Sequence, residues 1–257
     1  MSFRYETQKK NILGELKCGD PIYRIFSYQR FVEMICRKRL TLATPALWDD
    51  PFENFLLKSK VDMGDGTVAG LDMVASRWYG QCWTTEKDSD ALWRIYSHTK
   101  CGIRVKTTAG KLFNALYKFN DPQAGLKYFI GKVDYKSQDE ISQLLQQSTF
   151  MGIAAGASNH SFAKLLCVKR TEFKHENEVR ILYCETGRGQ HDREKFWEFD
   201  IDPNALFEEV CLDPRTEQHV VTTTKEALSA MGLTLPVIKS PLYDFSEVII
   251  PMTSQPD

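Results

Sequence analysis

The stretch Val168–Tyr183, VKRTEFKHENEVRILY, brings a dense group of ionisable residues directly against an alternating apolar run. Every second residue from Val179 to Tyr183 is apolar or aromatic, and this period of two predicts a β-strand with one face toward the core. Glu178 opens that strand. The sequence therefore predicts that ionisable side chains stand at the beginning of a core strand.

Glu176 precedes Glu178 by two positions. If extended backbone begins at His175, both carboxylates lie on one strand face, about 7 Å apart. Two acids on one face indicate a functional role. The alternative is a solvated charge ladder at the mouth of a strand, which contributes little to stability. The cations of that ladder would be Lys169, Arg170, Lys174 and Arg180.

Composition narrows the class of protein. The chain has 257 residues, 42% hydrophobic and 26% charged, which is typical of a globular protein. A net charge of −1 argues against broad electrostatic binding of nucleic acid, although local basic runs such as Arg37–Arg39 remain compatible with it. The seven cysteines are scattered, with no C-x-x-C spacing, and no apolar run reaches membrane-spanning length. We expect a soluble, cytoplasmic protein without a membrane partner.

The order of expected elements predicts the fold class. Strands are expected over 22–26, 40–42, 79–85, 101–106, 129–135, 178–183, 196–201, 209–212 and 248–250. Helices are expected over 29–36, 88–97, 111–117, 137–147, 162–168, 203–207 and 224–231. This irregular alternation favours an α+β fold with a mixed, mainly antiparallel sheet. Residues 1–20 are expected to form an N-terminal arm, and 21–257 a single compact domain.

One constellation of residues fits chemistry on a dinucleotide. Arg24 lies in the first expected strand, Thr84 and Thr85 end a middle strand, and Glu176-x-Glu178 opens a late one. A guanidinium binds phosphate bidentately, hydroxyls orient a ribose, and a carboxylate stabilises an oxocarbenium-like centre. Because an unpaired buried guanidinium is costly, Arg24 is expected to face solvent or an anionic partner.

Several motifs together resemble a known bacterial family, the domain-of-unknown-function family twenty-nine seventy-one. The resemblance runs from about Tyr23 to Arg215. The motifs are Tyr23-Arg24, Asp49-Asp50-Pro51-Phe52-Glu53, Cys82-Trp83-Thr84, Leu92-Trp93 with Tyr96, Gly102-Ile103-Arg104-Val105, and Lys169, Phe173, Glu176-x-Glu178-x-Arg180. The family itself implies no established biochemistry, and hints only at toxin or phage-defence biology.

The chain is more distantly similar to ADP-ribosyltransferases, with their split sheet. That similarity implies NAD as co-substrate, bound by Tyr23, Arg24, Thr84 and Thr85. It also implies Glu178 as the catalytic acid, with Glu176 orienting the attacking group. The acceptor, whether protein, nucleic acid or small molecule, does not follow from the sequence, nor does the oligomeric state.

Two other functions stay open. Asp134 with Glu178-Val179-Arg180 is also compatible with a divergent metal-dependent nuclease, although Arg replaces the usual Lys of an E-x-K motif. A non-catalytic sensor or interaction module would instead use Trp48, Trp83, Trp93 and Tyr96 for packing. The sequence contains no H-E-x-x-H motif, no Cys/His pairing and no G-x-S-x-G elbow, so no metal ligands or catalytic triad are predicted.

Overall fold

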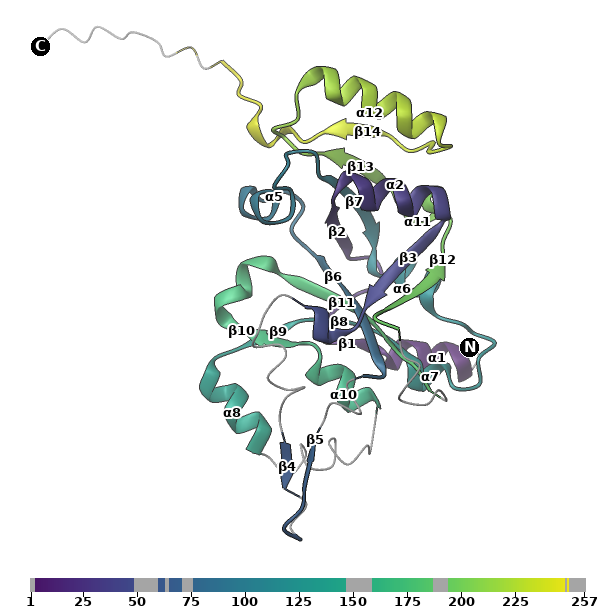
Figure 1. The fold of residues 1–257 in the computed structure, drawn as a ribbon, viewed down its shortest axis with the longest axis vertical. Helices are drawn as coiled ribbons and strands as arrows, with labels where there is room; N and C mark the ends of the chain where they lie inside the picture. Colours follow the sequence, from purple (N-terminus) through teal and green to yellow (C-terminus); the bar gives the residue numbers. More distant parts are fainter. Residues whose placement is uncertain are drawn as a thin grey trace, which may run out of the picture.

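The computed structural model describes residues 3–48, 60–62, 65–70, 76–146, 159–186, 194–247 and 249 (Figure 1). The helices in these ranges are α1 (Phe3–Lys10), α2 (Tyr28–Arg37), α5 (Asp90–Tyr96), α6 (Ala109–Leu116), α7 (Ala124–Lys127), α8 (Gln138–Gln146), α10 (Asn159–Leu165), α11 (Pro203–Leu206), α12 (Gln218–Ala230), and the 3-10 helices η1 (Pro45–Leu47), η2 (Thr171–Glu176) and η4 (Pro241–Tyr243). The strands are β1 (Ile12–Leu13), β2 (Pro21–Phe26), β3 (Arg39–Ala43), β4 (Lys60–Asp62), β5 (Val68–Gly70), β6 (Trp78–Thr84), β7 (Ile103–Thr108), β8 (Tyr128–Lys132), β9 (Asp134–Lys136), β10 (Val168–Arg170), β11 (Glu178–Cys184), β12 (Phe196–Asp200), β13 (Glu209–Leu212) and β14 (Val237–Lys239).

Within the described residues, ten strands form one mixed sheet. Its order is β1-β8-β11-β6-β2-β7-β13-β14, with β3 pairing to β6 and β12 pairing to β3. The β1/β8 and β13/β14 pairs are parallel, and the other ladders of this sheet are antiparallel. The α+β class with a mixed, mainly antiparallel sheet is therefore confirmed.

The sheet is split along one edge of β6. Near one end, β6 pairs with β3 through Ala43 and Gly80, and at its last residue it pairs with β2 through Tyr23 and Thr84. Between these single pairs, residues 81–83 have no strand partner on that side in the described part of the chain. In Figure 1, β6 runs from β2 and β7 in the upper part of the sheet down to β11 and β8. The split leaves room for side chains beside the middle of β6.

The large hydrophobic core includes the inner face of α2. Phe31, Met34 and Ile35 of this helix are buried, as their spacing predicts. Ser27 caps the helix by accepting a hydrogen bond from the Arg30 N–H. The helix is therefore fixed over the sheet by packing on one face and by its cap.

Several expectations about local structure need correction. The helix expected over 162–168 ends at Leu165, and Val168 begins β10. The strand expected over 129–135 is two strands, because Val133 interrupts it and β9 pairs with β10 in a separate sheet. Helix α12 begins at Gln218, well before residue 224. The strand β14 was not predicted, and the strand expected over 248–250 lies outside the described residues except for 249.

The first residues of the chain join the sheet. Strand β1 pairs with β8 through Ile12 opposite Ile130 and Leu13 opposite Gly131. Leu13 is buried, and Asn11 donates hydrogen bonds to the carbonyls of Gly125 and Tyr128. Among the described helices, none combines the length and apolar character that a bilayer crossing requires.

Candidate active site

A cavity of about 560 Å³ opens beside β6, where the sheet is split. Its volume falls in the usual range for small-molecule sites. Strands β2, β6 and β11, helix α5 and the 3-10 helix η2 all contribute lining residues. The predicted site residues that line it are Tyr23, Arg24, Thr84, Glu176 and Glu178. Thr85 is not part of its lining.

Three of these residues lie in one row across neighbouring strands. Thr84 of β6 is opposite Tyr23 of β2 on one side and opposite Glu178 of β11 on the other. Tyr23 and Glu178 are 4% and 2% exposed, so the row lies inside the protein. The antiparallel register thus brings together positions that are far apart in the sequence.

Glu176 and Glu178 do not share a strand face. Residues Thr171–Glu176 form η2, Asn177 adopts a left-handed conformation with φ of 41°, and extended backbone begins only at Glu178. Asn tolerates this conformation better than most residues. The expectation of extended backbone from His175 is therefore wrong, and the i, i+2 geometry built on it is wrong as well.

The two carboxylates nevertheless converge on one ammonium group. Lys169 Nζ lies 2.7 Å from Glu176 Oε2 and 3.2 Å from Glu178 Oε2, and all three side chains are largely buried. The same Nζ lies 4.7 Å from the centre of the Phe173 ring. Lys169 was noted in the sequence only as part of the charged stretch and of the family resemblance. Its bridging position depends on the pairing of β10 with β9, which local sequence does not specify.

Glu178 is held as an anion by Arg180. Arg180 Nε donates to Glu178 Oε1 at 2.9 Å and Nη2 donates to Oε2 at 3.0 Å, while Nη1 donates to the Leu166 carbonyl at 2.6 Å. Burial by itself raises the pKa of Glu178, but the charge and hydrogen bonds of Arg180, with the charge of Lys169, lower it overall to about 2. The carboxylate therefore stays ionised at neutral pH.

Arg24 is half-buried and points toward β6. Its Nη1 donates to the carbonyl of Cys82, in the part of β6 that has no strand partner, and its guanidinium lies 5.1 Å from the Phe26 ring centre. Within the described residues Arg24 has no ion-pair partner, and its buried Nε has no hydrogen-bond partner. Burial lowers the pKa of Arg24, and the nearby Glu178 opposes this effect. Arg24 thus lines the open cavity while it also binds the Cys82 carbonyl, a contact that the sequence did not predict.

The two threonine hydroxyls bind the backbone of the turn before β11. Thr84 Oγ1 donates to the Glu176 carbonyl at 2.5 Å and accepts from the Glu86 N–H at 3.0 Å. Thr85 Oγ1 donates to the Asn177 carbonyl at 3.3 Å. In this structure the hydroxyls therefore hold the turn that carries Glu176.

Trp48 and Tyr135 complete the surroundings of the acid pair. The Trp48 ring lies 4.5 Å from the Arg180 guanidinium and lines the cavity, and the Tyr135 hydroxyl accepts a hydrogen bond from the Glu178 N–H at 2.8 Å. From the sequence, Trp48 was expected only to pack, and no role was expected for Tyr135. Gly80, a glycine within a strand, was a usable signal, because such a glycine often marks close approach of another group. The Asp49–Glu53 loop lies outside the described residues.

The nuclease constellation is not assembled around this cavity. Asp134 forms an ion pair with Lys136 at 2.8 Å and does not line the cavity that contains Glu178. Across the described ranges, no group of three or more His, Cys, Asp or Glu side chains is placed to hold a metal ion.

Comparison with known proteins gives a family match and distant structural similarities. A family described as "Protein of unknown function (DUF2971)" matches residues 92–181, which confirms the family resemblance over that segment. No curated protein matches. Among solved structures, Thermus sp. 2.9 DarT in complex with NAD+ is 14% identical, with a TM-score of 0.40, over 88% of this chain and 97% of that one. Thermus sp. 2.9 DarT in complex with ADP-ribosylated ssDNA is 13% identical, with a TM-score of 0.39, over 89% and 97%. At these scores the likeness is distant, and the chemistry of the site has to come from its own residues.

Proposed function

We propose that this chain is an NAD-dependent ADP-ribosyltransferase-like enzyme, which cleaves the bond between nicotinamide and ribose and transfers ADP-ribose to an acceptor. The observation that carries the proposal is the acid pair Glu176 and Glu178, bridged by Lys169 in the wall of the 560 Å³ cavity. Fixed carboxylates beside a reacting ribose are the electrostatic requirement for breaking a glycosidic bond.

The two acids of the pair have different roles in the proposed reaction. When the bond from ribose C1′ to the nicotinamide nitrogen breaks, its electron pair leaves with nicotinamide and positive charge develops on the ribose. Glu178, ionised and fixed by Arg180, stabilises that charge. Glu176 orients the acceptor nucleophile, or water when no acceptor is present, and takes its proton as the new bond to C1′ forms. Lys169 keeps the distance between the two acids constant.

The opposite wall of the cavity fits the anionic part of NAD. Arg24 lines the cavity, and in the described part of the chain its guanidinium donates to the Cys82 carbonyl and lies over the Phe26 ring but forms no ion pair. A guanidinium in this state favours a phosphate group, which it binds bidentately. Tyr23 lines the same wall of the cavity. Thr84 and Thr85 contribute to the position of Glu176, because their hydroxyls hold the turn that carries it.

The direct test is NAD⁺ binding and nicotinamide release by the purified protein in EDTA. The variant Glu176→Gln should retain the fold and lose nicotinamide release. The matched control is Glu172→Gln, which removes an exposed carboxylate from the same 3-10 helix and should behave as the wild type. Glu178→Gln should also lose release, and its stability has to be measured in parallel because it breaks a buried ion pair.

The outcomes separate the candidate functions. If the wild type neither binds NAD⁺ nor releases nicotinamide, the proposal is wrong. Phosphodiester hydrolysis that requires Mn²⁺ and is lost in Asp134→Asn would instead support the nuclease. Release that is retained in Glu176→Gln would remove the acid pair from the reaction.

A further inference from the structure

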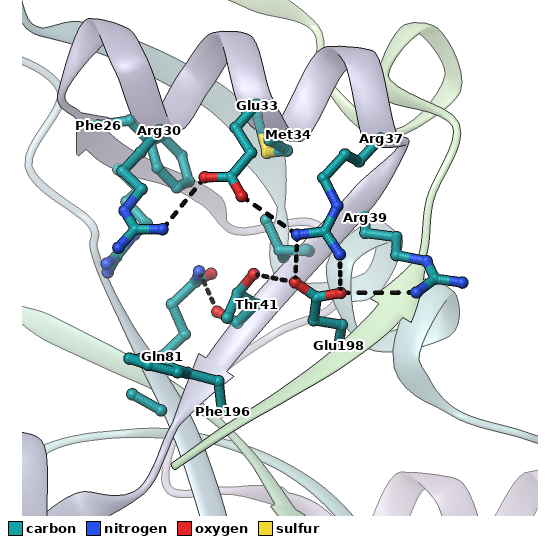
Figure 2. A pocket seen from close by; sticks show the side chains of 13 residues that line it. Phe26, Arg30, Glu33, Met34, Arg37, Arg39, Thr41, Gln81, Phe196 and Glu198 are labelled. Carbon is teal, nitrogen blue, oxygen red and sulfur yellow. Dashed lines mark hydrogen bonds and ion pairs between the residues drawn. The ribbon is translucent and has the colours of Figure 1, made fainter. Parts of the chain in front are cut away.

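A second pocket, of about 360 Å³, adjoins the cavity just described. It lies between α2, β3 and β12, and we call it the arginine groove (Figure 2). Its charged lining residues are Arg24, Arg30, Arg37, Arg39, Glu33 and Glu198. Arg24, Thr41, Ala43 and Gln81 line both the groove and the cavity. A ligand in the groove would therefore meet a ligand in the cavity at Arg24.

The charges in the groove form a chain of ion pairs. Glu33 lies 3.1 Å from both Arg30 and Arg37, and Glu198 lies 2.7 Å from Arg37 and 3.6 Å from Arg39. Figure 2 shows each glutamate between two arginines. Four guanidiniums and two carboxylates line the groove, and a third carboxylate, that of Asp200, lies 3.1 Å from Arg39. One positive charge therefore remains in excess, although the chain as a whole has a net charge of −1. The groove is thus a local positive site on a nearly neutral protein.

These arginines are accessible to an incoming anion. Their side chains are 69%, 47% and 49% exposed for Arg30, Arg37 and Arg39. Exposed ion pairs contribute little to stability, so a phosphate group replaces such a contact at little cost.

An exposed aromatic ring lies in the same groove. Phe196 is 46% exposed and lines it, and Figure 2 shows this ring below the row of arginines. Arginines that bind phosphate, combined with an aromatic face that stacks on a base, are the elements of nucleotide recognition. An inorganic anion would make no use of the Phe196 ring.

We propose that the arginine groove binds a nucleotide, with its phosphate on Arg30, Arg37 and Arg39 and its base on Phe196. The idea that the groove holds the acceptor rests on the proposed function, because the groove shares Arg24 and Gln81 with the cavity that the acid pair lines. The nucleotide can be free or part of a strand, since both present the same phosphate and base.

Binding of three probes to the full-length protein tests the groove. Inorganic pyrophosphate, AMP and a short single-stranded oligonucleotide are titrated calorimetrically, with and without saturating NAD⁺. The double variant Arg30→Gln/Arg39→Gln should weaken all three by about tenfold or more. Phe196→Ala should weaken AMP and the oligonucleotide by about fivefold or more and leave pyrophosphate unchanged. Arg94→Gln, which removes an exposed arginine outside both pockets, is the matched control.

Each result is informative. If the oligonucleotide binds more tightly than AMP and its affinity falls steeply with salt, the natural ligand is part of a nucleic-acid strand. If AMP and the oligonucleotide bind equally well, the natural ligand is a free nucleotide. Affinities in the double variant equal to those of Arg94→Gln would overturn the site. So would full displacement of the probes by NAD⁺, which would make the groove a part of the NAD site. Failure of NAD⁺ binding alone would overturn the proposed function and leave the groove as a nucleotide site.

Discussion

The guanidinium of Arg180 and the carboxylate of Glu178 form a bidentate pair inside the protein, with N–O distances of 2.9 and 3.0 Å. Both residues belong to β11, two positions apart, and they are 1% and 2% exposed. Two charges in this environment are compatible with folding because each satisfies the other and Arg180 also binds the Leu166 carbonyl. The ion pair therefore fixes both the position and the negative charge of Glu178 in the folded protein.

Removing Arg180 should destabilise the protein strongly. In Arg180→Met the apolar contacts of the side chain are largely retained, but the Glu178 carboxylate loses its main partner and stays buried. Breaking a buried ion pair in this way costs about 3–5 kcal/mol. Urea unfolding measures the difference. Arg94→Met, which breaks an exposed pair with Asp90, should cost at most about 1 kcal/mol. Equal losses in the two variants would contradict the assigned role of the buried pair.

The Glu178 carboxylate should make stability depend on pH in an acidic window. Its pKa falls from an ordinary value of 4.5 to about 2 in the folded protein. A depressed pKa contributes stability that is complete above the unfolded value, and this stability is lost as the pH falls from 4.5 toward 2. The contribution at neutral pH is on the order of 3 kcal/mol.

Unfolding titrations of the wild type and Glu178→Gln across this window test the prediction. The wild type should be the more stable protein at pH 6, and the difference should shrink as the pH approaches 2. Glu172→Gln, which changes an exposed acid, should follow the wild-type profile. A difference between wild type and Glu178→Gln that stays constant with pH would show that Glu178 is not the group that titrates.

Short-range patterns in the sequence predicted the positions of several site residues. The alternation after Glu178 predicted β11, and the apolar runs around Arg24 and Thr84 predicted β2 and β6. The order and register of these strands, which local patterns do not predict, place Tyr23, Thr84 and Glu178 in one row.

What the sequence left open depends on contacts between distant segments. The bridge from Lys169 to both acids requires the β9/β10 pair, and the bond from Arg24 to the Cys82 carbonyl requires the split beside β6. The turn at Asn177 was missed because the E-x-E spacing is equally compatible with a strand and with a left-handed residue between the two acids. The arginine groove joins α2 to β12, segments that local patterns cannot relate.

Thr84 should act on the site through the backbone. Thr84→Val keeps the shape of the side chain but leaves the Glu176 carbonyl and the Glu86 N–H without the hydroxyl. Loss of these partners should destabilise the protein by about 1–3 kcal/mol and lower nicotinamide release by displacing Glu176. Thr85→Val removes one longer bond and should have a smaller effect. A Thr84→Val protein with wild-type stability but weakened NAD⁺ binding would indicate a direct contact with the co-substrate instead.

Gly80 should be required for the position of Trp48. A Cβ atom at this position would lie 2.7 Å from Trp48 Cζ2 and 2.9 Å from Leu182 Cδ2, both too close without a shift. Gly80→Ala should therefore cost about 1–3 kcal/mol in thermal or urea unfolding. Because Trp48 lines the cavity and covers the Arg180 guanidinium, the same variant should bind NAD⁺ more weakly. Gly19→Ala is the control, since a Cβ there has no neighbour within 4 Å. If Gly80→Ala matches Gly19→Ala in both stability and NAD⁺ affinity, the contact between Trp48 and β6 does not determine the shape of the cavity.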